Sequence, residues 1–73
     1  MLSKNELINF ISKLLEVESS QLIEINSLNE FENWDSLSKI SLQALLKEKY
    51  NLTLDESFFD KNIFLNEILE LVK

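Results

Sequence analysis

The centre of the chain, residues 34–50, reads WDSLSKISLQALLKEKY, and the rest of the sequence is best interpreted outward from it. Its apolar residues recur at the spacing of a helix face. They are Leu37, Ile40, Leu42, Ala44, Leu45, Leu46 and Tyr50. Asp35 and Ser36 both suit the N-terminal cap of a helix, and Asn51 suits the left-handed residue that follows one. The stretch predicts a helix over residues 36–50.

A second helix is predicted toward the N-terminus, from about Ser3 to Val17. Apolar residues again recur three and four positions apart, at Leu7, Ile8, Ile11, Leu14 and Leu15. Ser3 and Glu6 have the spacing of a capping box, in which each side chain binds the backbone N–H of the other residue.

The last segment predicts a third main helix, with Asn62 as its cap. The apolar stripe consists of Phe64, Leu65, Ile68, Leu69 and Val72. Between this helix and the central one, residues 55–59 read DESFF and predict a short turn of helix.

The connection from Glu18 to Trp34 has no clear periodicity. It is nevertheless rich in apolar residues: Leu22, Ile23, Ile25, Leu28, Phe31 and Trp34. A freely solvated loop would not carry so many, so we predict an ordered crossover that packs across the helix ends and lets the two flanking helices run in similar directions. A lone strand at residues 22–26 would have no partner.

Glycine and proline, the usual residues of turns, are both absent. Asparagine tolerates the left-handed conformation better than most residues. We therefore expect the turns at the asparagines between the apolar segments, which are Asn26, Asn29, Asn33, Asn51 and Asn62.

Histidine and cysteine are also absent from the 73 residues, which excludes the usual zinc sites, Cys–His catalysis and Ser–His–Asp triads. Seven lysines against thirteen acidic residues give a net charge of −6, which disfavours binding to the phosphates of nucleic acid. No signal peptide or long apolar run follows Met1. We expect a cytoplasmic chain without membrane association, metal or catalytic activity of its own.

Asp35 and Ser36 form the one local arrangement with a chemical use. In the simplest interpretation they only cap the helix that follows. The N-terminus of a helix also offers free N–H groups and the positive end of the helix dipole, which together accommodate a phosphate. A serine there presents its hydroxyl to solvent beside an anion site.

In this setting the sequence resembles the acyl carrier proteins, whose hallmark is Asp-Ser-Leu at the start of the second helix, about halfway along a chain of this length. Here the motif is Asp35-Ser36-Leu37. The resemblance is most specific over residues 34–54 and extends to the last helix; it includes Ile40, Leu42, Leu46, Glu48, Tyr50, Leu65, Leu69 and Val72. It implies a single acyl carrier domain over residues 1–73, an all-α bundle of three main helices plus one short helix, with a long ordered loop between the first two helices.

The resemblance also implies a prosthetic group, 4′-phosphopantetheine, attached covalently to Ser36. A phosphopantetheinyl transferase (holo-carrier synthase) would move it from coenzyme A with magnesium, and Asp35 and Leu37 would complete the attachment site. Trp34, Ile40 and Glu48 would contribute to recognition of partners. The chain would act as a monomer that carries acyl or aminoacyl groups as thioesters between an acyl-loading ligase or acyltransferase and ketosynthase-type enzymes.

Two residues before the motif depart from the family, which usually has glycine there. Asn33 can replace glycine in a left-handed position. Trp34 either folds over the helix start as part of the core or belongs to the surface that partners recognise.

The charge of the central helix also differs from that of the family, in which this helix is usually strongly acidic. Residues 36–50 carry Lys39, Lys47 and Lys49 against Glu48 alone. This pattern indicates either a specialised acyl-transfer pathway in place of general fatty-acid biosynthesis, or neutral drift at solvated positions.

Large aromatic residues stand near the place where the family shelters an acyl chain: Tyr50, Phe58, Phe59 and Phe64. If they fill the core, the cargo is short or remains exposed to solvent.

The alternative is a helical protein-interaction module without a prosthetic group, in which Trp34 is part of a binding patch and Ser36 is only a cap. A helix-turn-helix DNA-binding protein is disfavoured by the net charge and by the absence of arginine, the residue that commonly reads guanine.

Overall fold

A computed structural model describes residues 3–72 of the chain. Over this range it is all-helical and has no strand, apart from one isolated antiparallel bridge between Ser27 and Phe64. The elements in chain order are α1 (Lys4–Leu15), α2 (Ser19–Ile25), the 3-10 turn η1 (Leu28–Glu30), α3 (Ser36–Tyr50), α4 (Glu56–Phe59) and α5 (Leu65–Leu71).

Helix α1 begins with the predicted capping box. The Ser3 hydroxyl accepts a hydrogen bond from the Glu6 N–H, and the Glu6 carboxylate accepts one from the Ser3 N–H, both at 3.2 Å. The helix ends two residues before the predicted end at Val17, because Glu16 adopts the left-handed conformation with φ 58°.

Helix α3 has the predicted bounds. Asp35 is its N-cap, with Oδ1 accepting a hydrogen bond from the Ser38 N–H at 2.9 Å. At the other end Asn51 is left-handed, with φ 53°, and its N–H binds the Lys47 carbonyl at 3.0 Å. Both predicted helix ends are confirmed.

The connection between α1 and α3 is ordered, as predicted, but it contains a helix that the sequence did not predict. In α2 only Leu22 is buried, whereas Ile23 and Ile25 are 53% and 46% exposed. One buried residue in seven gives no periodic stripe, so the helix has no sequence signal of the usual kind.

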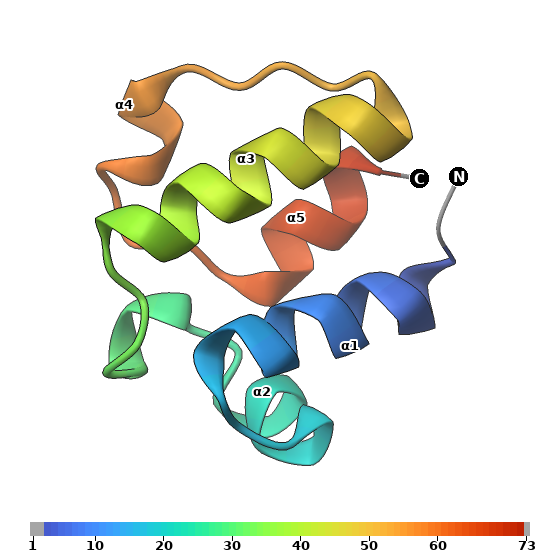
Figure 1. Cartoon of the computed structure of the whole chain (residues 1–73). Helices are drawn as coiled ribbons and strands as arrows, with labels where there is room; N and C mark the ends of the chain where they lie inside the picture. The colour runs from blue at the N-terminus through green and yellow to red at the C-terminus, as the bar shows by residue number, and fades with distance from the viewer. Residues whose placement is uncertain (1–2, 73) are drawn as a thin grey trace.

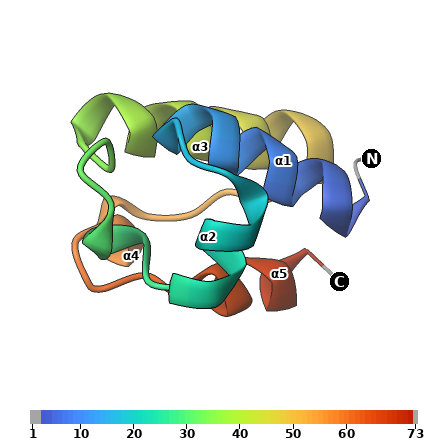
Figure 2. The same cartoon turned by 90° about the horizontal axis from the view of Figure 1, so that it is seen from below.

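The prediction that the two helices flanking this connection run in similar directions is wrong. Figures 1 and 2 show α1 and α3 side by side in one layer and running in opposite directions, with α4 and α5 in the other layer. The reason lies in Asn33, whose side-chain N–H donates to the Leu15 carbonyl at 3.0 Å. This bond returns the connection to the end of α1, so α3 starts where α1 stops and runs back along it.

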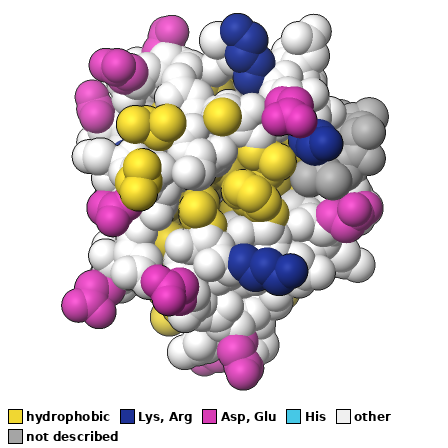
Figure 3. All heavy atoms as spheres, in the orientation of Figure 1, with side chains coloured by type: hydrophobic (Ala, Val, Ile, Leu, Met, Phe, Trp, Pro, Cys, Tyr) yellow, Lys and Arg dark blue, Asp and Glu magenta, His cyan; other side chains and the backbone are white. Residues whose placement is uncertain are grey.

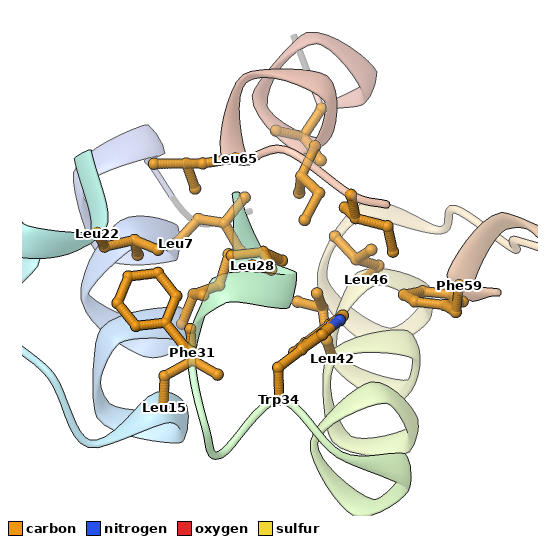
Figure 4. Packing of buried hydrophobic residues seen from close by; sticks show 14 residues of the cluster. Leu7, Leu15, Leu22, Leu28, Phe31, Trp34, Leu42, Leu46, Phe59 and Leu65 are labelled. Atoms are coloured by element: carbon orange, nitrogen blue, oxygen red, sulfur yellow. The ribbon is translucent and has the colours of Figure 1, made fainter. Parts of the chain in front are cut away.

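The hydrophobic core draws on every helix. Figure 4 shows side chains from α1, the connection, α3, α4 and α5 pointing toward one another. The cluster consists of Leu7, Ile11, Leu15, Leu22, Leu28, Phe31, Trp34, Leu42, Leu46, Phe59, Ile63, Leu65, Ile68 and Val72. The connection supplies Leu28, Phe31 and Trp34, so it is part of the core and not a linker across it.

The last helix does not begin as predicted. Its N-cap is Phe64, and the Glu67 carboxylate accepts from the Phe64 N–H at 3.2 Å. Asn62 is not the cap, because its side-chain oxygen instead accepts a hydrogen bond from the Ser27 hydroxyl at 3.1 Å. Two loops far apart in the sequence are joined in this way.

The asparagines therefore divide into two groups. Asn26 and Asn51 have positive φ, 67° and 53°, as a turn position requires. Asn29, Asn33 and Asn62 do not, and they hold the loops through side-chain hydrogen bonds instead.

Candidate functional site

Ser36 is the first residue of α3, and its side chain is exposed. Its hydroxyl has no hydrogen-bond partner among residues 3–72. The hydroxyl is thus free to react, at the end of a helix whose dipole favours a negative group.

Asp35 holds the start of this helix. The hydrogen bond from the Ser38 backbone N–H lowers the pKa of the Asp35 carboxyl below its ordinary value, and partial desolvation opposes the effect only in part. Asp35 is therefore ionised at neutral pH, with one oxygen engaged by the backbone of α3.

The loop before Ser36 is fixed by two further side chains. The Ser38 hydroxyl donates to the Asn33 carbonyl at 2.6 Å. The Asn33 amide in turn donates to the Leu15 carbonyl and to the Glu16 carboxylate, both at 3.0 Å. Asn33 does not occupy the left-handed position that was expected for it, since its role is to tie the loop to the end of α1.

Trp34 belongs to the core, so its interpretation as part of a partner-recognition surface is wrong. Its side chain is 8% exposed and packs against Phe59, with ring centroids 6.5 Å apart. The indole Nε1 is buried and has no hydrogen-bond partner. A partner approaching Ser36 would touch little of the indole.

Leu37 and Ile40 are the exposed apolar residues near Ser36. They are 73% and 61% exposed, although both lie in the predicted apolar stripe of α3. The space-filling view in Figure 3 shows hydrophobic side chains gathered over and beside α3, with acidic groups around the edge of this face. The structure therefore brings Leu37 and Ile40 to the same region of the surface as Ser36.

Glu48 lies apart from this cluster. It is twelve positions after Ser36 along α3, which is about 18 Å at the rise of an α-helix. Its exposed carboxylate is 3.6 Å from the ammonium of Lys49. The predicted site residues thus form one cluster around Ser36, with Glu48 at the far end of the helix and Trp34 beneath the surface.

A groove between α3 and α4 opens beside Ser36, and the sequence did not predict it. It has a volume of about 230 Å³ and is lined by Ser36, Lys39, Ile40, Gln43, Glu56, Phe59 and Asp60. A second hollow, lined by Ile40, Gln43, Ala44, Lys47 and Thr53, continues it along α3. The helical spacing of residues 36, 39, 40 and 43 places them on one face, but nothing in the sequence indicates that Phe59 closes the other side.

The chemistry available at Ser36 is that of a group acceptor. The chain has no histidine, and the carboxylate of Asp35, the residue before Ser36, is engaged in capping. Within the described range no three acidic side chains are arranged to hold a metal ion. No side chain of residues 3–72 is hydrogen-bonded to the Ser36 hydroxyl to take its proton, although the carboxylates of Glu56 and Asp60 line the same groove.

None of the helices in residues 3–72 is long and apolar enough to cross a membrane. Comparison of the chain with protein-family models, with curated proteins and with solved structures gives no match.

Proposed function

We propose that this chain is an acyl carrier protein whose 4′-phosphopantetheine group is attached to Ser36. The single observation that carries the proposal is the exposed, unbonded hydroxyl of Ser36 at the N-terminus of α3, within Asp35-Ser36-Leu37. The chain itself is not an enzyme in this proposal, because the partner supplies the chemistry.

The residues around Ser36 fit a phosphodiester. The positive end of the α3 dipole faces this position. Lys39 lines the same groove one turn further along, and its ammonium forms no ion pair with any residue of the described part. The chain has no cysteine, so the phosphopantetheine group would supply the thiol, at the end of a flexible arm.

Attachment is a group transfer from coenzyme A. The Ser36 Oγ forms a bond to the phosphorus next to the pantetheine, and the pyrophosphate bond breaks. Adenosine 3′,5′-bisphosphate leaves, and the serine proton passes to a base of the phosphopantetheinyl transferase, which also holds the magnesium. Asp35 orders the backbone that presents Ser36.

Leu37 and Ile40 supply the surface that partner enzymes contact in this proposal. Both are largely exposed and flank Ser36 on α3. The partners are the transferase, an acyl-loading ligase or acyltransferase, and ketosynthase-type enzymes. Covalent tethering raises the effective concentration of the acyl thioester at each of their active sites.

The charge of α3 bears on the pathway. Three lysines and one glutamate give this helix a net charge of +2 within a chain of −6. A specialised pathway whose enzymes present acidic residues fits this surface better than enzymes that dock through basic ones. The test compares the turnover of this chain by a fatty-acid synthase ketosynthase with that of a standard carrier. Equal turnover of the two carriers would rule out the specialised pathway.

A protein-interaction module without a prosthetic group is the second candidate. The exposure of Leu37 and Ile40 favours it, since exposed apolar residues side by side commonly mark an interface. The burial of Trp34 removes the anchor that this candidate would otherwise use.

The mass of the intact protein separates the two candidates. We expect incubation with coenzyme A, magnesium and a broad-specificity phosphopantetheinyl transferase to add one phosphopantetheinyl group to the wild type and to Ser41→Ala, a control on the same helix. Ser36→Ala should gain none. Unmodified wild type that is folded by circular dichroism would favour the interaction module.

A further inference from the structure

Among residues 3–72, the indole nitrogen of Trp34 is the one buried polar side-chain atom without a hydrogen-bond partner. Buried donors in folded proteins are nearly always paired, so an unpaired one calls for an explanation. Trp34 is 8% exposed, and its backbone N–H is already bound to the Phe31 carbonyl at 3.1 Å. The unpaired N–H is therefore a specific feature of the side chain.

The Trp34 side chain is connected to the groove beside Ser36 through Phe59. Phe59 lines the groove and also contacts Trp34, with the two rings inclined at 43°. Figure 4 shows the indole nitrogen at the end of the Trp34 side chain that is turned toward Phe59. A ligand that enters the groove and displaces Phe59 slightly would meet the N–H.

The helix that carries Phe59 is suited to such a movement. Helix α4 has only four residues, Glu56–Phe59, and no side-chain hydrogen bond caps its start. Phe59 itself is 4% exposed and belongs to the core cluster, where its ring lies near Trp34 and edge-on to Phe58, with the centroids of the two phenyl rings 5.2 Å apart. Elements with few restraining bonds are those that open most easily.

The groove has a mixed lining, in which polar side chains stand beside the apolar surface of Ile40 and Phe59. Lys39 offers an unpaired ammonium from α3, and Gln43, whose amide N–H binds the Leu54 carbonyl at 2.8 Å, adds a second polar side chain. Glu56 and Asp60 stand on the opposite side. Such walls suit a chain that carries hydrogen-bonding oxygens and nitrogens.

We propose that the groove between α3 and α4 receives a carbonyl-bearing segment attached to Ser36, and that a carbonyl oxygen of this segment accepts a hydrogen bond from Trp34 Nε1. The inference rests on the carrier function proposed above. Such an oxygen has three sources: an amide of the pantetheine arm, the thioester carbonyl, or an oxo group in the acyl chain. Each would pair the one orphaned donor of the core.

The test uses the fact that the chain has one tryptophan, which gives one indole signal in a proton–nitrogen NMR spectrum. The transferase loads ¹⁵N-labelled protein from coenzyme A, butanoyl-coenzyme A or 3-oxobutanoyl-coenzyme A, and intact mass verifies each product. A downfield shift of the indole proton with slower exchange in all three products assigns the arm as the source. The same change in both acylated forms, but not in the form loaded from coenzyme A, assigns the thioester carbonyl. A change only in the 3-oxobutanoyl form assigns the oxo group of the acyl chain.

An indole signal that is identical in the unloaded protein and in all three loaded forms would overturn the inference while leaving the carrier function intact. Failure of the mass to increase would overturn the carrier function, and the inference with it. Trp34→Phe is the matched variant, because it keeps an aromatic ring and removes the donor. The rise in melting temperature on loading should be smaller in this variant than in the wild type, and an equal rise would contradict the inference.

Discussion

At the scale of single residues, Ser36 and Ser38 show how position on one helix separates two uses of the same side chain. Two residues along an α-helix turn the side chain by about 200°, so these serines face nearly opposite sides. Ser36 is exposed and unbonded, whereas Ser38 is 6% exposed and its hydroxyl donates to the Asn33 carbonyl. Ser36 has the features of a reactive site, and Ser38 those of a structural one.

Stability should therefore respond differently to the two alanine substitutions. Ser38→Ala removes a part-buried hydrogen bond, and we expect a loss of about 1 kcal/mol in the free energy of unfolding. Ser36→Ala should change it by less than about 0.5 kcal/mol, as is usual at exposed positions. Urea denaturation followed by circular dichroism measures both, and equal losses would contradict the assignment.

The lowered pKa of the Asp35 carboxyl predicts that the stability of the protein depends on pH. Its pKa is lowered in the folded protein, so its contribution to stability is present above the ordinary value of 3.8 and is lost as the pH falls through the lower folded value. Asp35→Asn keeps an acceptor for the Ser38 N–H and removes the charge. The melting-temperature difference between wild type and this variant should shrink when the pH falls from 6 to 3, and a difference that grows would refute the account.

At the scale of helices and loops, the sequence predicted the helices that have a periodic stripe of buried residues. It did not predict the features that depend on contacts between distant segments. The capping box of α1 and both ends of α3 follow from local residue types. Helix α2 was missed for two reasons. Only Leu22 of its seven residues is buried, and the residue before it, Glu18, is not of a type that usually caps helices. The side chain of Gln21, which accepts from the Glu18 N–H at 3.3 Å, was the signal available.

Substitutions of two asparagines test whether each is needed for its backbone conformation or for its side-chain hydrogen bonds. Asn51→Gly should be neutral or slightly stabilising, because residue 51 is left-handed and glycine adopts this conformation readily. Asn33→Gly should cost about 1–3 kcal/mol, since it removes the bonds to the Leu15 carbonyl and the Glu16 carboxylate. Thermal unfolding of both variants decides the matter: a neutral Asn33→Gly would mean that residue 33 acts as a turn and not as a tie.

At the scale of the whole molecule, one cluster of fourteen buried residues joins all the helices, and the connection before α3 is part of it. The candidate site depends on this, because the loop that presents Ser36 is anchored below by Phe31 and Trp34. The sequence alone could place Ser36 at a helix start. It could not show that Trp34 lies inside or that Phe59 forms a wall of the groove, because both facts depend on how distant segments meet.

Leu28→Ala tests the structural role of the connection. Leu28 is fully buried, so we expect a loss of about 2–5 kcal/mol in the free energy of unfolding. Ile23, in the same connection but 53% exposed, is the matched control, and Ile23→Ala should cost far less. Chemical denaturation compares the two, and a loss below about 1 kcal/mol for Leu28→Ala would show that the connection is not part of the core.

The central claim is that Ser36 alone, among the serines of this molecule, accepts phosphopantetheine, and its most direct test is the location of the added mass. Cleavage after lysine yields a peptide of residues 14–39 that holds Ser36 together with Ser19, Ser20, Ser27 and Ser38. After reaction of the folded protein with coenzyme A, magnesium and the transferase, tandem mass spectrometry of this peptide should place one phosphopantetheinyl group on Ser36. An unmodified peptide, or a group on any of the other four serines, would contradict the account.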